Sequence, residues 1–380
     1  MLHTALPPAS PRPAIATAFA AAAFCLVMLT GAWQFIAAAR NPDGLEYPGT
    51  WLDFREGRMT LGLERQLDKK LPARSDLIAG ANTLRYLLTG GGGDQVRVGK
   101  DDWLFLTEEL RFDAGGAAAL NARAELLGAA ASELERQGVK LVVALVPDKA
   151  RVYADQLARG HYPTYNNSRY QDGLSALRAR HVTTVDLLQP LNRAAARSQV
   201  YYRSDTHWNQ AGAQVAAQAV ATAVQRLGKG LEKTNFSTTT EGGPTARAGD
   251  LIRLMGLHDM PNAVRPKPDK ETPTMTRQTS ADVAGGSLFG DVATVPVVLT
   301  GTSYSMRGNF HGYLQQALSA RVLNTAKDGG GFLQAPTAYL TDDAFRSAKP
   351  KVLVWELPER FLLVKLDGEA QWLAKVGLRP

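Results

Sequence analysis

Two short segments contain the three residue types of a serine-hydrolase-type site. Asp205 and His207 lie two residues apart, directly before an expected helix, and Ser303 follows a β-branched strand expected at 295–299. A serine hydroxyl is a weak nucleophile until a base takes its proton, so His207 is the candidate base. Asp205 would hold the imidazole tautomer and stabilise its charged form. Gly301 would permit a tight turn and a close approach of substrate to backbone N–H groups that stabilise an oxyanion.

Each of these residues also has a structural interpretation. Asp205 or Ser204 would serve as the N-cap of the following helix, His207 would be a structural histidine, and Gly-Thr-Ser is a common turn composition. A metal site at Asp205 and His207 needs a third ligand, and the histidines elsewhere form no ligand-spaced cluster: His161, His181, His258 and His311. We therefore expect no metal and no cofactor. The single cysteine, Cys25, leaves no disulfide and no Cys-type zinc site.

The elements that must position these residues alternate between strand and helix from residue 96 onward. The predicted strands and helices are a short strand within 96–106, a helix at 120–137, a strand at 140–146, a helix at 168–180, a strand at 182–187, a helix at 210–227, a strand at 295–299, a helix at 309–320 and a strand at 351–357. Apolar strands separated by helices indicate a mostly parallel sheet covered on both faces. Ligands of such sheets bind at the carboxyl ends of the strands, where Ser303 lies.

The polar segment 228–293 interrupts this alternation, since it is rich in Thr, Gly, Pro and charged residues. A loop of this length in a compact domain is either functional or disordered, and the sequence leaves both possibilities open.

The amino-terminal part of the chain predicts export. Residues 14–39 are 26 residues without a charge, between Arg12 and Arg40. A bilayer core about 30 Å thick needs roughly 20 apolar helical residues, so this stretch is long enough to span it. The alternative is a cleaved signal peptide that ends at the small residues 37–39, although the apolar core of such a peptide is usually only about 7–15 residues. Both interpretations export the remainder.

Charge and segment boundaries complete the outline. The chain of 380 residues has Lys+Arg 43 and Asp+Glu 36, a net charge of +7. These charges are dispersed and form no basic stripe, so we expect no nucleic-acid partner. The predicted segments are a cytosolic terminus at 1–13, the anchor at 14–39, a helical juxtamembrane region at 40–95 and a catalytic domain at 96–380 with the insertion 228–293.

Several motifs together resemble the AlgJ/AlgX (WssI-like) family of SGNH-hydrolase-like polysaccharide O-acetyltransferases. The most specific is the Asp-Thr-His-Trp-Asn run at 205–209 followed by Gly-Thr-Ser at 301–303. Supporting matches are Gly-Lys-Asp-Asp-Trp-Leu-Phe at 99–105, Val-Pro-Asp-Lys-Ala-Arg-Val-Tyr at 146–153 and Trp-Glu-Leu-Pro-Glu-Arg at 355–360. The resemblance implies a three-layer α/β/α domain and a triad of Ser303, His207 and Asp205. The Asp/His block precedes the serine, which resembles the circularly permuted motif order of this family.

The resemblance also suggests further site residues. Gly301, and Gly330 within a run of three glycines, are candidates for the oxyanion hole, and Arg360 is a candidate for oxyanion or substrate contact. Trp208 and Tyr304 offer aromatic faces for a sugar ring, or belong to the core.

The resemblance implies a periplasmic O-acetyltransferase. It would move acetyl groups through a serine acetyl-enzyme onto hydroxyls of an exported polysaccharide, with cellulose and alginate both open. The implied partners are the exopolysaccharide acceptor and a membrane-bound O-acyltransferase of the AlgI type that presents acetyl groups. We expect a single-pass inner-membrane protein with its catalytic domain in the periplasm. The alternatives are an acetylesterase of the SGNH type and a non-catalytic polysaccharide-binding assembly subunit.

Overall fold

The computed structural model describes residues 74–279, 295–364 and 368–378, together with shorter stretches between residues 22 and 61. The chain divides into two units, residues 1–81 and residues 82–380. Residues 1–13 and much of the predicted anchor at 14–39 lie outside the described residues. Among the helices that the structure does describe, none combines the length and the apolar character needed to cross a bilayer.

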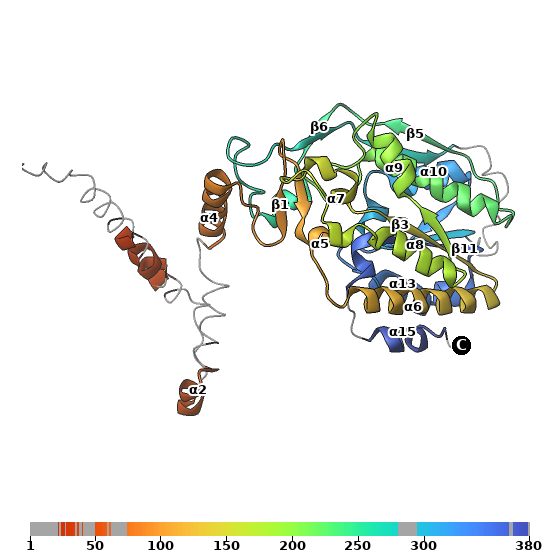
Figure 1. Cartoon of the computed structure of the whole chain (residues 1–380), viewed down its shortest axis with the longest axis horizontal. Coiled ribbons are helices and arrows are strands. Elements are labelled where there is room, and N and C mark those ends of the chain that lie inside the picture. The colour runs from red at the N-terminus through yellow and green to blue at the C-terminus, as the bar shows by residue number, and fades with distance from the viewer. Residues whose placement is uncertain are drawn as a thin grey trace, which may run out of the picture. The chain divides into compact units, whose positions relative to one another are not determined.

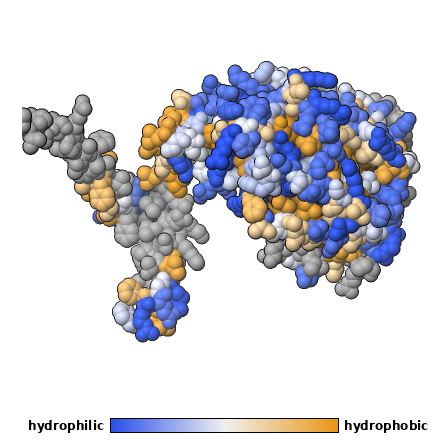
Figure 2. All heavy atoms as spheres, in the orientation of Figure 1, coloured by the Kyte–Doolittle hydropathy of each residue, from blue (hydrophilic) through white to orange (hydrophobic). Residues whose placement is uncertain are grey.

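The first unit contains α2 (Trp51–Arg55) and the start of α4 (Arg74–Thr89). Thr50 caps α2, because its side chain accepts from the backbone of Asp53 while the Asp53 carboxylate accepts from the Thr50 amide. Along α4 the large apolar side chains stay exposed (Figure 2): Leu77, Ile78, Leu84, Leu87 and Leu88. α4 crosses the boundary between the two units, which lies after residue 81.

The second unit is built around a five-stranded parallel sheet in the order β10-β9-β11-β3-β4. Its strands are β3 (Lys140–Val146), β4 (Thr183–Asp186), β9 (Val297–Thr300), β10 (Val322–Asn324) and β11 (Val352–Pro358). β3 and β11 are seven residues long and buried from end to end apart from Lys140, which is why they appear in the sequence as apolar runs, interrupted in β11 by Glu356.

Helices cover both faces of this sheet (Figure 1). Alternate residues of β3 and β11 point to opposite faces, so the buried core forms two clusters. One face packs on α6 (Gly116–Arg136), α8 (Arg169–Ala179), α13 (Gln334–Thr341) and α15 (Glu369–Lys375), and the other on α9 (Leu188–Ala195), α10 (Gln210–Arg226) and α12 (Phe310–Leu318). The predicted three-layer arrangement is present.

The segment 96–106 differs from its prediction as one short strand. It forms an antiparallel hairpin of β1 (Val96–Val98) and β2 (Leu104–Leu106), separate from the central sheet. Its turn needs Asp101 and Asp102 at positive φ, a local conformation that a strand pattern does not reveal.

The insertion 228–293 is ordered over its described part, up to residue 279. It contains β5 (Phe236–Thr240) paired with β8 (Thr274–Gln278), β6 (Thr245–Arg247) paired with β7 (Asp269–Glu271), and α11 (Asp250–Leu254). The remaining short elements are α5 (Thr107–Leu110), α7 (Lys149–Val152), α14 (Asp343–Ser347), and the 3-10 turns η1 (Ala154–Gln156), η2 (Thr164–Asn166), η3 (Ser303–Met306) and η4 (Glu359–Leu362).

Candidate active site

Ser303, His207 and Asp205 are in hydrogen-bond contact although the serine lies 96 residues after the histidine. The His207 Nε2 lies 2.6 Å from the Ser303 hydroxyl, and the His207 Nδ1 lies 2.6 Å from Asp205 Oδ1. A carboxylate only accepts, so Nδ1 carries a proton and donates to Asp205. Nε2 is then free to accept the proton of Ser303, which is the arrangement a serine nucleophile requires.

The environment of Asp205 keeps this carboxyl ionised. Burial alone would raise the pKa of Asp205, but hydrogen bonds from His207 and the charge of Arg247 outweigh burial and hold the pKa below its usual value. The helix-cap interpretation of Asp205 does not hold, because Asn209 caps α10 by accepting from the Gly212 amide. Asp205 is therefore available to orient the imidazole.

The turn that carries Ser303 is held by a buried carboxylate. Glu356 of β11 is fully buried and accepts from the Thr302 amide at 2.7 Å and from the Ser305 hydroxyl at 3.1 Å. Burial raises the pKa of Glu356. Gly301 has φ +150°, and a Cβ there would lie 2.7 Å from the Glu356 backbone oxygen and 2.7 Å from its Oε2. Gly301 is needed for this close approach, so its predicted place in the turn is explained by Glu356, a residue the sequence analysis did not single out.

A buried lysine fixes the backbone of the segment that carries Asp205. The Lys149 ammonium donates to the backbone oxygens of Leu104, Arg203 and Asp205 at 2.6, 2.8 and 2.9 Å. Burial lowers the pKa of Lys149 to about 8. Three carbonyls satisfy the three donors of an ammonium, so Lys149 joins the β1–β2 hairpin to the Asp205 segment.

The insertion holds the same segment from its other side. The Asp269 carboxylate accepts from the Arg203 and Ser204 amides at 2.9 Å each and from the Ser204 hydroxyl at 2.6 Å. Asp250 accepts from the Thr206 amide at 2.7 Å. Neither aspartate was predicted as a site residue, because no spacing signal marks them in a polar segment.

These residues open onto a cavity of about 330 Å³ at the carboxyl edge of the sheet, where ligands of parallel sheets bind. The segments after β9, β10 and β11 contribute Ser303, Asp328 and Arg360 to its wall. The full lining is Leu106, Asp205, Thr206, His207, Arg247, Ala248, Asp250, Arg253, Leu254, Ser303, Arg307, Asp328, Gly329 and Arg360. Four arginines against three aspartates make this a cationic site.

Comparison with known proteins identifies a family for the chain. Residues 96–359 match the family described as SGNH hydrolase-like domain, acetyltransferase AlgX. The chain belongs to this family. It is 37% identical over 330 residues to the probable alginate O-acetylase AlgJ of Pseudomonas putida, covering 84% of each chain, and 35% identical over 342 residues to that of Pseudomonas aeruginosa, also with 84% of each. The solved O-acetyltransferase domain of P. putida AlgJ superimposes with a TM-score of 0.64 at 37% identity, covering 74% of this chain and 98% of that one.

Within this AlgX-family fold, Trp208 and Tyr304 do not face the cavity. Both side chains are fully buried, and their rings contact each other with centroids 5.0 Å apart. The Tyr304 hydroxyl donates to the Thr206 backbone oxygen at 2.8 Å, and Trp208 packs on Phe310. Both residues therefore belong to the core in this structure, which is one of the two interpretations given for them.

Gly330 is also misplaced for an oxyanion donor. Its amide donates to the Lys327 backbone oxygen at 3.3 Å, and its neighbour Gly329 lines the cavity instead.

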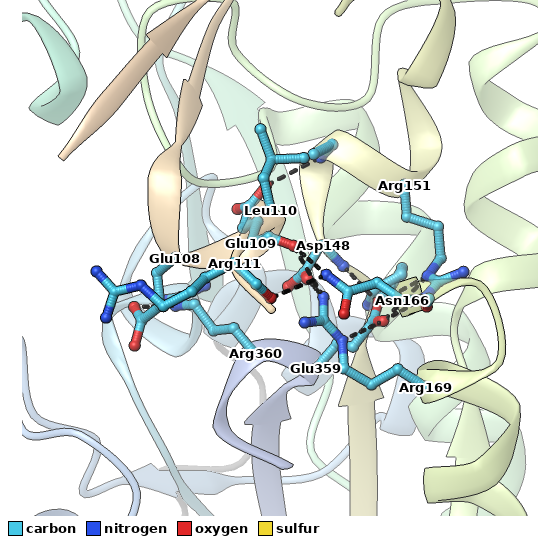
Figure 3. Close-up of polar contacts among 12 residues, drawn as sticks. Glu108, Glu109, Leu110, Arg111, Asp148, Arg151, Asn166, Arg169, Glu359 and Arg360 are labelled. Carbon is cyan, nitrogen blue, oxygen red and sulfur yellow. Dashed lines mark hydrogen bonds and ion pairs between the residues drawn. The ribbon is translucent and has the colours of Figure 1, made fainter. Parts of the chain in front are cut away.

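Arg360 does line the cavity, and a buried charge network holds it there (Figure 3). Its Nε lies 3.6 Å from Glu108 Oε2. The preceding Glu359 accepts from Arg169 at 2.9 Å and from Arg151, which fixes η4. Arg360 is 9% exposed, and its Nη1 is buried with no hydrogen-bond partner among the described residues. Arg360 therefore places a positive charge at the cavity wall, and a guanidinium group attracts anionic oxygens.

Asp205, His207 and Asp250 place one possible metal ligand each within 4.8 Å of one another, so the structure provides a third residue of ligand type that the sequence analysis lacked. Arg247 already lies 3.2 Å from Asp205 Oδ2. A cation would compete with that arginine and displace the Nδ1 proton, so the donor set fits proton transfer better than metal binding.

Because Trp208 is core, we predict that Trp208→Ala lowers the free energy of unfolding by about 3–5 kcal/mol through the cavity it leaves. Chemical denaturation measures this loss. Among molecules that remain folded, the ratio of free acetate to acetylated glycan should equal that of wild type. A changed ratio at unchanged stability would instead place Trp208 at the acceptor.

Proposed function

We propose that this chain is a polysaccharide O-acetyltransferase that carries the acetyl group on Ser303. The observation that supports it most directly is the contact of Ser303 with His207, and of His207 with Asp205, at the wall of a cationic cavity. The relatives named alginate O-acetylase, which match most of this chain, support the same activity.

The first half of the reaction forms the acetyl-enzyme. His207 Nε2 takes the Ser303 proton as Oγ bonds to the acetyl carbonyl carbon, and the electron pair of the carbonyl moves onto its oxygen. The oxyanion collapses, the bond to the donor oxygen breaks, and the imidazolium returns the proton to that leaving oxygen. Asp205 stabilises the imidazolium in both steps.

The second half transfers the acetyl group to a sugar. A sugar hydroxyl gives its proton to Nε2 and attacks the acetyl carbon, and Ser303 regains a proton as it leaves. Water competes as an acceptor, so transfer requires that the cavity orient the hydroxyl better than it admits water. An acetylesterase performs the same steps with water, and the assay below separates the two.

The arginines favour an anionic acceptor over a neutral one. Arg253 is exposed at the cavity, and Arg307 and Arg360 also line it, Arg307 while pairing with Asp328 at 2.6 Å. Carboxylates of a uronate polymer such as alginate satisfy guanidinium groups, whereas cellulose has no charge. We therefore propose an alginate-type acceptor.

Location and donor belong to the same proposal. The uncharged segment 14–39 supports an inner-membrane anchor with the catalytic unit in the periplasm. A membrane-bound O-acyltransferase partner would supply the acetyl donor there.

We predict acetyl transfer from a chromogenic acetyl ester to alginate oligosaccharides, detected by mass, and little transfer to cello-oligosaccharides. Arg360→Gln should lower transfer to the uronate acceptor about 10–100-fold, because one charge-assisted hydrogen bond is lost. Ester cleavage without acceptor should change less. Arg346→Gln, an exposed charge change on α14, is the matched control.

Other outcomes are equally informative. An equal loss of cleavage and transfer in Arg360→Gln would make Arg360 an oxyanion donor. Free acetate as the only product with every glycan, and with the membrane partner present, would replace the transferase by an esterase.

A further inference from the structure

The insertion contacts the backbone of the catalytic segment without intervening side chains. Gly249 lies so close that a Cβ there would come 2.0 Å from the Ser204 backbone oxygen and 2.6 Å from the Asp205 nitrogen. Only glycine permits this approach. Arg247 at the end of β6 and Asp250 at the start of α11 therefore lie next to the Asp205–His207 pair.

Asp250 brings a negative charge to His207. Its Oδ2 lies 3.6 Å from the His207 Nδ1, while its two oxygens accept from the Thr206 amide at 2.7 Å and the Thr206 hydroxyl at 2.8 Å. Its own amide donates to Asp205 Oδ2 at 3.2 Å. The side chain is 37% exposed and lines the cavity.

Arg247 brings a positive charge to Asp205. Its Nη2 lies 3.2 Å from Asp205 Oδ2, the carboxylate oxygen that does not contact the imidazole. The guanidinium stacks over the Tyr202 ring, 4.4 Å from the centroid, which fixes it in place. Of the two charges of the insertion, the positive one is thus close to the Asp205 carboxylate and the negative one is close to the His207 imidazole.

We propose that Arg247 and Asp250 are positioning residues of opposite charge that set the pH at which the Asp205–His207 pair becomes catalytically competent. The proposal rests on the proposed function, since it assumes that His207 acts as the base for Ser303. The negative charge of Asp250 near Nδ1 favours the protonated imidazole. The positive charge of Arg247 next to the Asp205 carboxylate disfavours the protonated imidazole. The insertion balances these opposed effects.

The other groups around the pair act from different elements and stay unchanged in the test. They are Ser303 and Tyr304 of η3, Lys149 of α7 at the Asp205 backbone oxygen, Arg360 of η4, and the cavity residues Arg253, Arg307 and Asp328.

The test is the pH profile of kcat/KM for cleavage of a chromogenic acetyl ester by the full chain. Asp250→Asn should move the midpoint of the acid limb to lower pH, and Arg247→Gln should move it to higher pH. We expect about half a pH unit each, because both groups are partly exposed and screened. Arg247→Lys keeps the charge and should restore the wild-type midpoint.

Matched controls come from the same insertion. Glu241, directly after β5, pairs with Arg277 of β8, and neither residue lines the cavity. Glu241→Gln and Arg277→Gln remove the same charges from this pair and should leave the midpoint in place. Thr206→Val removes a hydrogen bond to Asp250 but no charge. The midpoint should therefore stay within about 0.2 pH units of the wild-type value, even if the maximal kcat/KM changes.

Shifts in the same direction for Asp250→Asn and Arg247→Gln, or no shift in folded proteins, would overturn the proposal. A Thr206→Val shift as large as that of Asp250→Asn would also overturn it, since geometry rather than charge would then act. If Asp250→Asn does not fold, Arg247→Gln against Arg247→Lys decides. Failure of the proposed function is distinguishable, because then wild type and Ser303→Ala would cleave the ester equally.

Discussion

Ser303→Ala is expected to lower acetyl-ester cleavage and acetyl transfer by at least about 10³-fold while the protein remains folded. Without Oγ no acetyl-enzyme forms, and only binding and oxyanion stabilisation remain. The substitution removes one oxygen from a residue that is 9% exposed, and leaves Glu356 with its bonds to Thr302 and Ser305. The measurements are initial rates on an acetyl ester, intact mass after exposure to donor, and a denaturation curve.

Ser305→Ala is the matched control for this substitution. Ser305 lies two residues later in the same turn, but its hydroxyl donates to Glu356 and it does not line the cavity. It should keep most of the activity and still become acetylated. If Ser303→Ala retains wild-type turnover and Ser305→Ala does not, the nucleophile has been assigned to the wrong serine.

The parts of the fold that could be predicted are those where burial on both faces leaves an apolar run. β3 and β11 are such runs, and the structure confirms both within one residue of the predicted ends. The hairpin at 96–106 could not be paired correctly, because its register depends on two aspartates at positive φ in the turn. Which strands pair, and in which register, depends on residues far apart in the sequence, so a local sequence pattern does not reveal it.

The candidate site divides in the same way. Asp205, His207 and Ser303 belong to short motifs, so residue type and position in the chain were enough to select them as candidates, and the structure brings the three into contact. Asp250 lies 43 residues beyond His207 in a polar segment, and only the folded chain brings it to 3.6 Å from the imidazole. Glu356 carried a signal that was missed. An acid inside the apolar run 352–358 must be buried, and a buried carboxylate needs hydrogen-bond donors nearby.

Lys149 shows why charge alone is a poor guide to exposure. A lysine after Pro147-Asp148 suggests a solvated turn, yet its ammonium is fully buried and satisfied by three backbone oxygens. The sequence contains no sign of those carbonyls, since they come from segments 45 to 56 residues away. Buried polar groups of this kind depend on tertiary structure, and their roles emerge only with it.

The coupling of Asp205, His207 and Ser303 gives the second large expected effect. We predict that His207→Ala lowers kcat/KM for ester cleavage by at least about 10³-fold, and that Asp205→Ala lowers it somewhat less. The double variant Asp205→Ala/His207→Ala should be little worse than His207→Ala. The reason is that Asp205 acts on the reaction through the imidazole it orients at 2.6 Å, and has nothing to orient once the ring is gone.

A double-mutant cycle turns this expectation into a number. If the two residues acted independently, their fold-losses would multiply, and two losses of about 10³ would give about 10⁶. If they act as one unit, the loss in the double variant stays near 10³-fold, and the difference from about 10⁶-fold measures their coupling.

Asp269→Asn paired with His207→Ala serves as a reference cycle, since Asp269 holds the Ser204 backbone without touching the imidazole. Losses that multiply for Asp205 and His207 would mean that Asp205 supports the segment rather than the base. The 2.6 Å contact between carboxylate and imidazole would then be structural, and the proton relay would have to rest on His207 and Asp250 instead.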